Sequence, residues 1–201
     1  MDELKQNPQP AANGGGIKAV AGFFWDLLKI LIIALVIIVP FRIFVAEPFV
    51  VSGSSMLPNF HNGDYLIIDR LSYRFSQPDR GDVIVLLFPK DTSQFFIKRI
   101  IGLPGETVQI KQGHVYIFNQ QHPEGFELNE SYIPSGVMTY DQPDKKVTLG
   151  DNEYFVLGDN RLASSDSRVW GILPRNDIVG RVFLRVFPVA SASVFHPVNY
   201  Q

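Results

Sequence analysis

The feature that most constrains this chain is an apolar stretch from Ala19 to Val45, interrupted only by Asp26, Lys29 and Arg42. A helix needs about 20 such residues to cross the hydrocarbon core of a bilayer. Asp26 and Lys29 lie one helical turn apart near the amino end, so they can pair with each other or extend toward the headgroups. The stretch therefore predicts one transmembrane helix.

A cleaved secretory signal is the main alternative, because it also combines basic residues with an apolar core and ends at small residues. A cut after Ala46 would place the bulky Phe44 at one of the two positions that should be small. The Ala-x-Ala sequence in this region, Ala19 to Ala21, precedes the apolar core instead of following it. We therefore interpret the stretch as a retained anchor.

The residues before the anchor have almost nothing to bury. Met1–Gly16 is rich in Pro, Asn, Gln and Gly, a composition typical of disorder. Lys5, Lys18 and Lys29 outnumber Arg42 at the far end, which favours a cytoplasmic amino end and an extracytoplasmic location for the rest. The predicted organisation is a disordered cytoplasmic tail at 1–18, a single-pass anchor in the cell membrane at 19–45 and a folded domain at 46–201.

The pattern after the anchor is that of β-strands. Apolar runs rich in β-branched and aromatic residues stand between turn residues: GDVIVLLF, QFFIKRII, TVQIKQGHVYIF, EYFVLGD and IVGRVFLRVF. The Asn-Gly pair in FHNGDYLII predicts a hairpin. Residues 119–150 carry several prolines and few apolar runs, which indicates an irregular excursion or a small subdomain. The expected fold class is mainly β, preceded by one N-terminal transmembrane helix.

Composition excludes several kinds of chemistry. A formal net charge of −2 argues against a nucleic-acid-binding protein, and the absence of Cys excludes disulfides, thiol nucleophiles and cysteine-ligated zinc. The histidines lack the spacing of a metal site or of a histidine-based triad, so we interpret them as surface or turn residues. They are His61, His114, His122 and His196. We expect no metal and no cofactor.

The stretch FVVSGSSMLPNF, Phe49 to Phe60, places three serines and a glycine within four positions. Such a cluster is usually a solvated turn, because Ser and Gly tolerate bends and satisfy their own backbone there. Large apolar residues flank this one on both sides. One hydroxyl can therefore lie at an apolar surface, where a chemical role is the alternative to a turn.

A serine hydroxyl needs a nearby base, and with no suitable histidine the option is a buried, uncharged lysine. The candidate is Lys98, in SQFFIKRIIGLPGE. On a strand its side chain shares a face with Phe96 and Ile100, while the neighbouring Arg99 points to the other face. The alternative is a strand lysine that extends to water.

A third stretch, LGDNRLASSDSRVWGILP, is either a salt-bridged loop or part of the same site. Its acidic residues lack the spacing of a calcium-binding loop.

Together these stretches resemble the bacterial type I signal peptidases. The resemblance rests on SGSSMLP, GDYLIIDR, RGDVIVL, IKRIIGLPGE and GDNRLASSDSRVWGILP, in the family's order. It implies a membrane-bound serine endopeptidase with an antiparallel-sheet catalytic domain. Such an enzyme removes N-terminal signal peptides from exported proteins after small residues of the Ala-x-Ala type, without a cofactor. Its partners would be preproteins and the lipid bilayer.

The resemblance also implies roles for individual residues. Ser55, which precedes Met56, matches the nucleophile, and Lys98, which precedes Arg99, matches the general base. Some members have a serine two residues before the nucleophile that donates to the oxyanion; here Gly53 stands there. The Ser55 backbone N–H would then act as the donor, with Ser52 and Ser54 as open alternatives.

Further residues matched by the resemblance surround this pair. Ser164 would orient the lysine amine, and two ion pairs would form, Arg99 with Asp159 and Asp166 with Arg168. Shallow pockets for small substrate side chains would be lined by Phe49, Val51, Met56, Leu66, Val85, Phe96 and Ile97. The sequence departs from the family at Asn59, where threonine is usual, and at Leu162-Ala163, where a polar pair is common.

Two other functions stay open at this point. A self-cleaving repressor has a similar Ser/Lys core, but it needs a DNA-binding domain and no anchor. A membrane-tethered β domain that only binds partners would use the serine cluster as an ordinary turn.

Overall fold

The computed structural model describes residues 15–44, 46–141, 145–195 and Tyr200. The chain divides into two compact units, Met1–Arg42 and Ile43–Gln201, and each is described by itself. Most of the predicted disordered tail, residues 1–14, and the last residue of the predicted anchor, Val45, lie outside the described residues.

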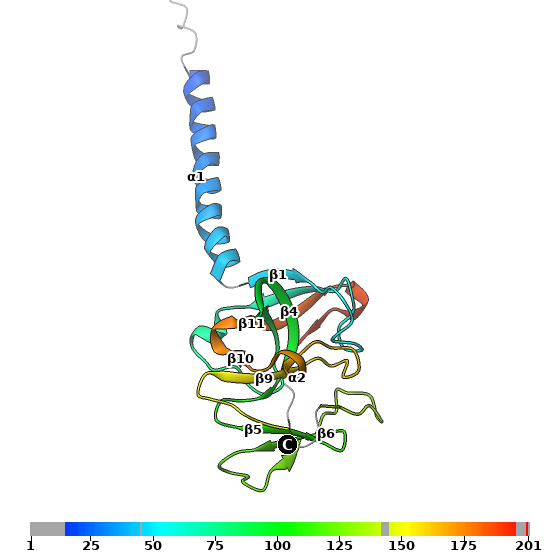
Figure 1. Cartoon of the computed structure of the whole chain (residues 1–201). Coiled ribbons are helices and arrows are strands. Elements are labelled where there is room, and N and C mark those ends of the chain that lie inside the picture. Colours follow the sequence, from blue (N-terminus) through cyan, green and yellow to red (C-terminus); the bar gives the residue numbers. More distant parts are fainter. Residues whose placement is uncertain (1–14, 45, 142–144, 196–199, 201) are drawn as a thin grey trace, which may run out of the picture. The chain divides into compact units, whose positions relative to one another are not determined.

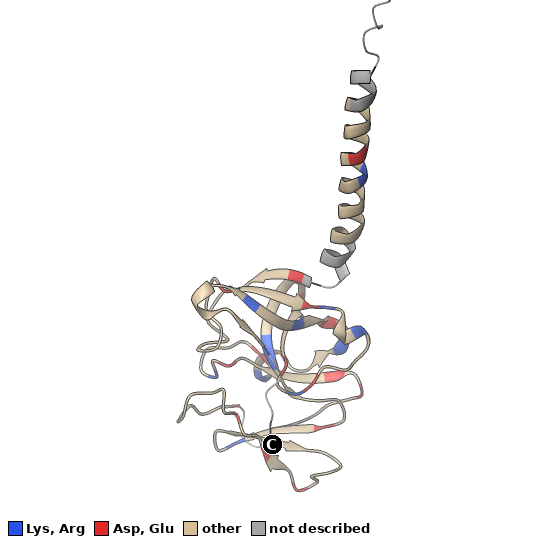
Figure 2. Ribbon diagram, turned by 180° about the vertical axis from the view of Figure 1, so that it is seen from behind, with Lys and Arg blue, Asp and Glu red and all other residues tan. Residues whose placement is uncertain are grey.

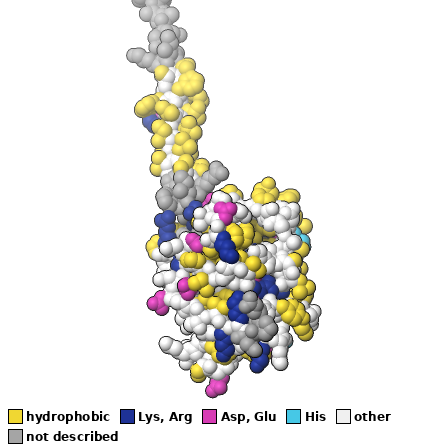
Figure 3. All heavy atoms as spheres, in the orientation of Figure 1, with side chains coloured by type: hydrophobic (Ala, Val, Ile, Leu, Met, Phe, Trp, Pro, Cys, Tyr) yellow, Lys and Arg dark blue, Asp and Glu magenta, His cyan; other side chains and the backbone are white. Residues whose placement is uncertain are grey.

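The first unit contains all but the last two residues of helix α1, Gly15–Phe44, which begins before the predicted anchor. The stretch Val20–Val39 is 20 residues long with a mean hydropathy of 2.5, and it is the one candidate membrane span among the described residues. At 1.5 Å per residue it reaches about 30 Å, the thickness of a bilayer core. Apolar side chains cover the described part of this helix (Figure 3), and charged residues are rare along it (Figure 2). Lys29 Nζ and Asp26 Oδ1 lie 3.0 Å apart.

The second unit is built from strands. They are β1 Ala46–Val50, β2 Tyr65–Asp69, β3 Val83–Phe88, β4 Asp91–Gly102, β5 Thr107–Lys111, β6 His114–Phe118, β7 Phe126–Glu127, β8 Lys146–Thr148, β9 Glu153–Leu157, β10 Leu173–Pro174, β11 Ile178–Phe187 and β12 Ser193–Val194. The short helical elements are η1 Ser72–Arg74, α2 Ser167–Trp170, η2 Arg175–Asp177 and η3 Val189–Ser191. Each run of letters predicted to form strands does so.

The strands form two antiparallel sheets (Figure 1). The larger sheet has the order β1-β2-β11-β3-β4-β9-β10, with β12 paired to β11. The smaller sheet has the order β7-β6-β5-β8. Since every pairing is antiparallel, the predicted fold class, mainly β with an antiparallel-sheet domain after one apolar helix, is confirmed.

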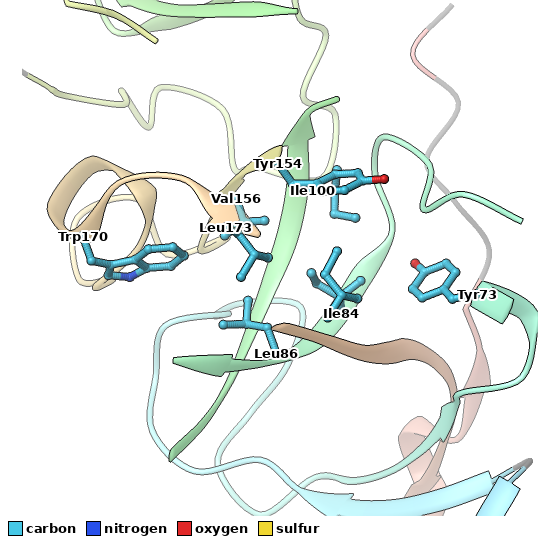
Figure 4. Close-up of a cluster of buried hydrophobic side chains, with 9 residues drawn as sticks. Tyr73, Ile84, Leu86, Ile100, Tyr154, Val156, Trp170 and Leu173 are labelled. Atoms are coloured by element: carbon cyan, nitrogen blue, oxygen red, sulfur yellow. The ribbon is translucent and has the colours of Figure 1, made fainter. Parts of the chain in front are cut away.

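The core explains why the alternating sequences form this sheet. In one cluster, side chains from β3, β4, β9, β10 and α2 point toward one another (Figure 4). Five residues of this cluster are fully buried: Ile84, Leu86, Ile100, Tyr154 and Val156. Burying a large apolar side chain is worth about 1.5–3 kcal/mol. The rigid centre of the sheet is therefore at β3, β4 and β9, and β4 is the strand that carries Lys98.

One sequence prediction differs from the observed fold. The Asn-Gly pair does not form a tight hairpin: β1 and β2 pair with each other, but residues 51–64 connect them. Residues 119–150, predicted as an irregular excursion or a small subdomain, contribute β7 and β8, which add to the two sides of the β5–β6 hairpin. These strands are too short to leave a clear alternating pattern in the sequence.

Candidate active site

Residues 51–64, here the serine loop, lie between β1 and β2. The loop is closed at its base, where Val51 N donates to Asp64 O and Gly63 N donates to Val51 O, both at 2.9 Å. Within it Phe60 N donates to Met56 O at 2.9 Å, a helical turn that places both side chains on one face. Met56 is 1% exposed and Phe60 fully buried. This apolar face fixes the loop to the sheet, and Ser55 lies at the edge of that turn.

Lys98 lies in the middle of β4, opposite Ile84 of β3. The residue is only 3% exposed, and its Nζ is 2.9 Å from Ser55 Oγ. The amine also donates to the carbonyl of Ile97 at 2.8 Å and lies 5.2 Å from the centre of the Phe96 ring. The structure thus brings Ser55 and Lys98 within hydrogen-bonding distance inside an apolar environment.

Burial lowers the pKa of Lys98 from 10.5 to about 8, because the charged ammonium loses its hydration. The negative charges of Asp166 and Asp159 act in the opposite direction but do not cancel this effect. A neutral amine at this distance can accept a proton from the serine hydroxyl.

On the face of β4 opposite to Lys98, the Asp159 carboxylate accepts hydrogen bonds from one arginine and one asparagine side chain. Arg99 Nε and Nη2 donate to its two oxygens at 2.8 and 2.6 Å, and Asn59 Nδ2 donates at 2.8 Å. Asn59, the departure from the family pattern, also donates to the carbonyl of Tyr132 at 3.0 Å. The carboxylate is therefore held by three donors.

Asp166 is held in a similar way. Its two oxygens accept from Arg168 Nε at 2.8 Å and Nη2 at 2.7 Å, and Gly158 N donates at 3.0 Å. Asp166 also caps α2 by accepting from the backbone N–H of Arg168. Both ion pairs implied by the resemblance are present, and no ion pair to Lys98 is found within the described ranges.

Ser164 differs from its expected role. Its Oγ is buried and has no hydrogen-bond partner in the part of the chain that the structure describes. A Cβ placed on Gly158 would overlap this hydroxyl and the carbonyl oxygen of Ser55. Ser164 therefore packs against Gly158 and does not bind the amine of Lys98, which the carbonyl of Ile97 orients instead.

A cleft of about 240 Å³ opens beside Ser55 and Lys98. Of the seven residues expected to line the substrate pockets, six line this cleft: Phe49, Val51, Leu66, Val85, Phe96 and Ile97. Met56 does not, because its side chain points into the core as the anchor of the serine loop. The cleft lining is mostly apolar and includes both residues of the dyad.

The remaining lining residues were not predicted: Val50, Ser52, Phe95 and Ser165. Phe95 lies two positions before Ile97, so strand alternation could have identified it. Ser165 lies in a loop that only the folding of the chain brings to the cleft.

Among the residues that the structure describes, neither a metal site nor a histidine base is found near the dyad. Within the described residues, no three His, Asp or Glu side chains form a group that could hold a metal ion. His61, His114 and His122 are exposed, and His196 lies outside the described residues.

The substitution Asp159→Asn is expected to destabilise the fold. An asparagine would direct its own N–H groups at Arg99 or Asn59, and the arginine, 5% exposed, would lose its counter-charge. Breaking a buried pair in this way costs about 3–5 kcal/mol. The midpoint of thermal unfolding, measured in detergent, should fall clearly.

The matched control is Glu47→Gln, which breaks an exposed pair with Arg70. Surface pairs are worth about 0–1 kcal/mol, so this variant should melt close to wild type. If both variants melt like wild type, the Arg99–Asp159 pair does not stabilise the fold.

Comparison with known proteins shows the family to which this chain belongs. Residues 24–187 match the family model described as signal peptidase, peptidase S26. A probable signal peptidase I-1 from Synechocystis sp. is 40% identical over 177 residues, which cover 83% of this chain and 86% of that protein. The signal peptidase I of Bacillus amyloliquefaciens is 37% identical over 183 residues, covering 86% and 90%. A crystal structure of a signal peptidase I from Enterococcus faecalis V583 is 33% identical and covers 53% of this chain and 97% of that chain, with a TM-score of 0.43.

Proposed function

The chain belongs to the signal peptidase family, peptidase S26, a family of enzymes that remove signal peptides, and we propose that it does so with Ser55 and Lys98 as a catalytic dyad. The observation that carries this proposal is the 2.9 Å distance between Ser55 Oγ and a lysine amine that is almost wholly buried. A serine used only as a turn residue has no need of such a partner.

The reaction begins when Ser55 Oγ attacks the scissile carbonyl carbon while Lys98 takes the hydroxyl proton. The carbonyl electron pair moves to oxygen, where the Ser55 backbone N–H stabilises the negative charge. The C–N bond then breaks as the Lys98 ammonium returns its proton to the leaving amine. Water, deprotonated by the same lysine, attacks the ester carbonyl carbon. The lysine then returns this proton to Ser55 Oγ as the C–O bond breaks, so the dyad is restored.

The substrate is an extended segment at the end of a signal peptide, lying in the cleft beside the dyad. In such a segment the side chains one and three positions before the cut point the same way. The walls are mostly large apolar residues. We propose that the two hollows between them admit alanine and exclude leucine.

Cleavage of two peptides tests this function. The full chain in detergent and lipid is expected to cut an Ala-x-Ala peptide directly after its second alanine, as mass spectrometry of the products would show. Leucine in place of that alanine should lower kcat/KM by about 5- to 150-fold, since overpacking costs about 1–3 kcal/mol.

Leucine placed between the two alanines is the matched control. Its side chain points away from the cleft, so this peptide should be cut almost as fast as the parent. Equal cleavage of all three peptides would contradict the proposed specificity.

We propose that α1 is a single-pass membrane anchor with a cytoplasmic amino end and the β domain on the extracytoplasmic side. The length and hydropathy of Val20–Val39 support the span, and the excess of lysines near its amino end supports the orientation. This location matches the substrate, because a signal peptide reaches the outer surface still embedded in the bilayer.

A further inference from the structure

Asn160 contacts the peptide group that precedes the proposed nucleophile. Its Nδ2 donates to the carbonyl of Ser54 at 3.1 Å, and its backbone N–H donates to the carbonyl of Ser55 at 3.0 Å. The Ser54 carbonyl also accepts from Leu57 N at 3.2 Å. Asn160 follows β9, so a segment distant in the sequence holds two consecutive carbonyls of the serine loop.

These contacts determine where the Ser55 N–H points. A peptide group is planar and trans, so the carbonyl of Ser54 and the N–H of Ser55 point in opposite directions. A donor that fixes the carbonyl therefore fixes the N–H as well. Hydrogen bonding at the carbonyl oxygen also polarises the N–H, because linked hydrogen bonds strengthen one another.

The Ser55 N–H has no second oxyanion donor at Gly53, the position two residues before it. Gly53 carries no side chain that could donate to an oxyanion. Its own backbone N–H donates to Asn62 Oδ1 at 2.9 Å and is turned to that partner. The direction of the Ser55 N–H then decides how well the negative charge is stabilised.

We propose that Asn160 is a positioning residue that aims and polarises the Ser55 N–H toward the oxyanion formed from the scissile carbonyl. The proposal rests on the proposed function, in which this N–H is the oxyanion donor. Asn160 does not touch the substrate; it acts through the Ser54–Ser55 peptide group. Its effect should therefore be confined to states that carry the negative charge.

The test compares Asn160→Ala with wild type, as full chains in detergent and lipid with the Ala-x-Ala peptide. Removing an oxyanion donor costs about 10²–10³ in kcat, and misdirecting one should cost about 10- to 100-fold. KM should change by less than about twofold and the acid limb of kcat/KM should stay in place, since substrate binding and Lys98 are untouched.

A peptide aldehyde of the same sequence provides a readout that a loosened loop would not give. Ser55 Oγ forms a bond to the aldehyde carbon, Lys98 takes the hydroxyl proton, and the carbonyl oxygen becomes an oxyanion. The inhibition constant of the aldehyde should be higher for Asn160→Ala than for wild type, by the same factor by which kcat/KM is lower. The corresponding peptide alcohol, which ends in a neutral –CH2OH group and forms no oxyanion, should inhibit both enzymes equally.

Asn160→Asp is a second variant of the same shape. Its ionised carboxylate cannot donate to Ser54 and repels that carbonyl, so at the plateau pH it should be at least as slow as the alanine variant. Asn119→Ala is the matched control, because Asn119 donates to Glu106 and closes its own turn in the smaller sheet. That variant should keep wild-type kcat.

The outcomes separate the two proposals. If wild type does not cleave, or Ser55→Ala cleaves normally, the proposed function fails. If both behave as proposed but Asn160→Ala keeps kcat within about twofold, or weakens the aldehyde and the peptide alcohol equally, Asn160 has no positioning role.

Discussion

Replacing Lys98 by arginine or by methionine is expected to lower kcat/KM by at least about 10²-fold. General bases contribute about 10²–10⁴-fold, and neither replacement can serve as one near neutral pH. Arginine keeps the positive charge and stays protonated, while methionine keeps the length and apolar stem without a basic nitrogen. Initial rates on the Ala-x-Ala peptide measure the loss, and substantial activity in Lys98→Arg would contradict a neutral lysine base.

The methionine variant should at the same time be more stable than wild type. The pKa of Lys98 is lowered in the folded protein from 10.5 to about 8, so the unfolded chain binds the proton more tightly. This penalty is fully present below pH 8 and disappears as the pH rises to about 10.5. It is worth up to roughly 3 kcal/mol, from about 1.36 kcal/mol per pKa unit.

The free energy of unfolding, measured at two pH values, checks this expected gain in stability. Lys98→Met should exceed wild type in free energy of unfolding at pH values below 8, and the difference should shrink above 10. An inactive variant that is also less stable at every pH would indicate that the lysine supports the fold and would leave its catalytic role unsupported.

Replacing Ser55 by alanine is expected to have the largest effect, a loss of at least about 10⁴-fold in kcat. Loss of a serine nucleophile in a well-studied protease costs about 10⁶-fold, and the residual rate comes from binding and the oxyanion donor. The substitution removes one oxygen from a half-buried position, so the fold should persist. KM for the uncut peptide should stay near the wild-type value.

Ser54→Ala is the control for this experiment. Ser54 is its neighbour in the same cluster, and its side chain is exposed. This variant should keep kcat within about tenfold of wild type. If Ser54→Ala and Ser55→Ala lose activity equally, the serine loop as a whole, and not one nucleophile, is required.

The sequence predicted the fold because its strands alternate clearly. IVGRVFLRVF became β11, which alternates between buried and more exposed residues in its first half. QFFIKRII became β4, which is buried on both faces from Lys98 onward. The Asn-Gly prediction was wrong as a hairpin. Asn62 accepts from Gly53 N and Gly63 donates to Val51, so the pair closes a long loop instead of a two-residue turn.

In the candidate active site, only the residues that lie within family motifs could be predicted from the sequence. Ser55 and Lys98 are 43 positions apart, and no local pattern links them. The contacts of Asn59 with Asp159 and of Asn160 with Ser54 span 100 and 106 positions. An amide side chain finds its partner only after the chain has folded, so these roles could not be predicted from residue type.

The most direct test of the account is the pH dependence of kcat/KM for the wild-type enzyme, measured on a peptide without titratable side chains. The acid limb reports the pKa of the free enzyme's base. We expect it to fall tenfold per pH unit at low pH and to reach half its maximum at about pH 8, the pKa to which burial lowers Lys98. A half-maximum at about pH 10.4, the pKa of an exposed lysine, or a rate that stays constant down to pH 6 would contradict a buried neutral lysine as the base.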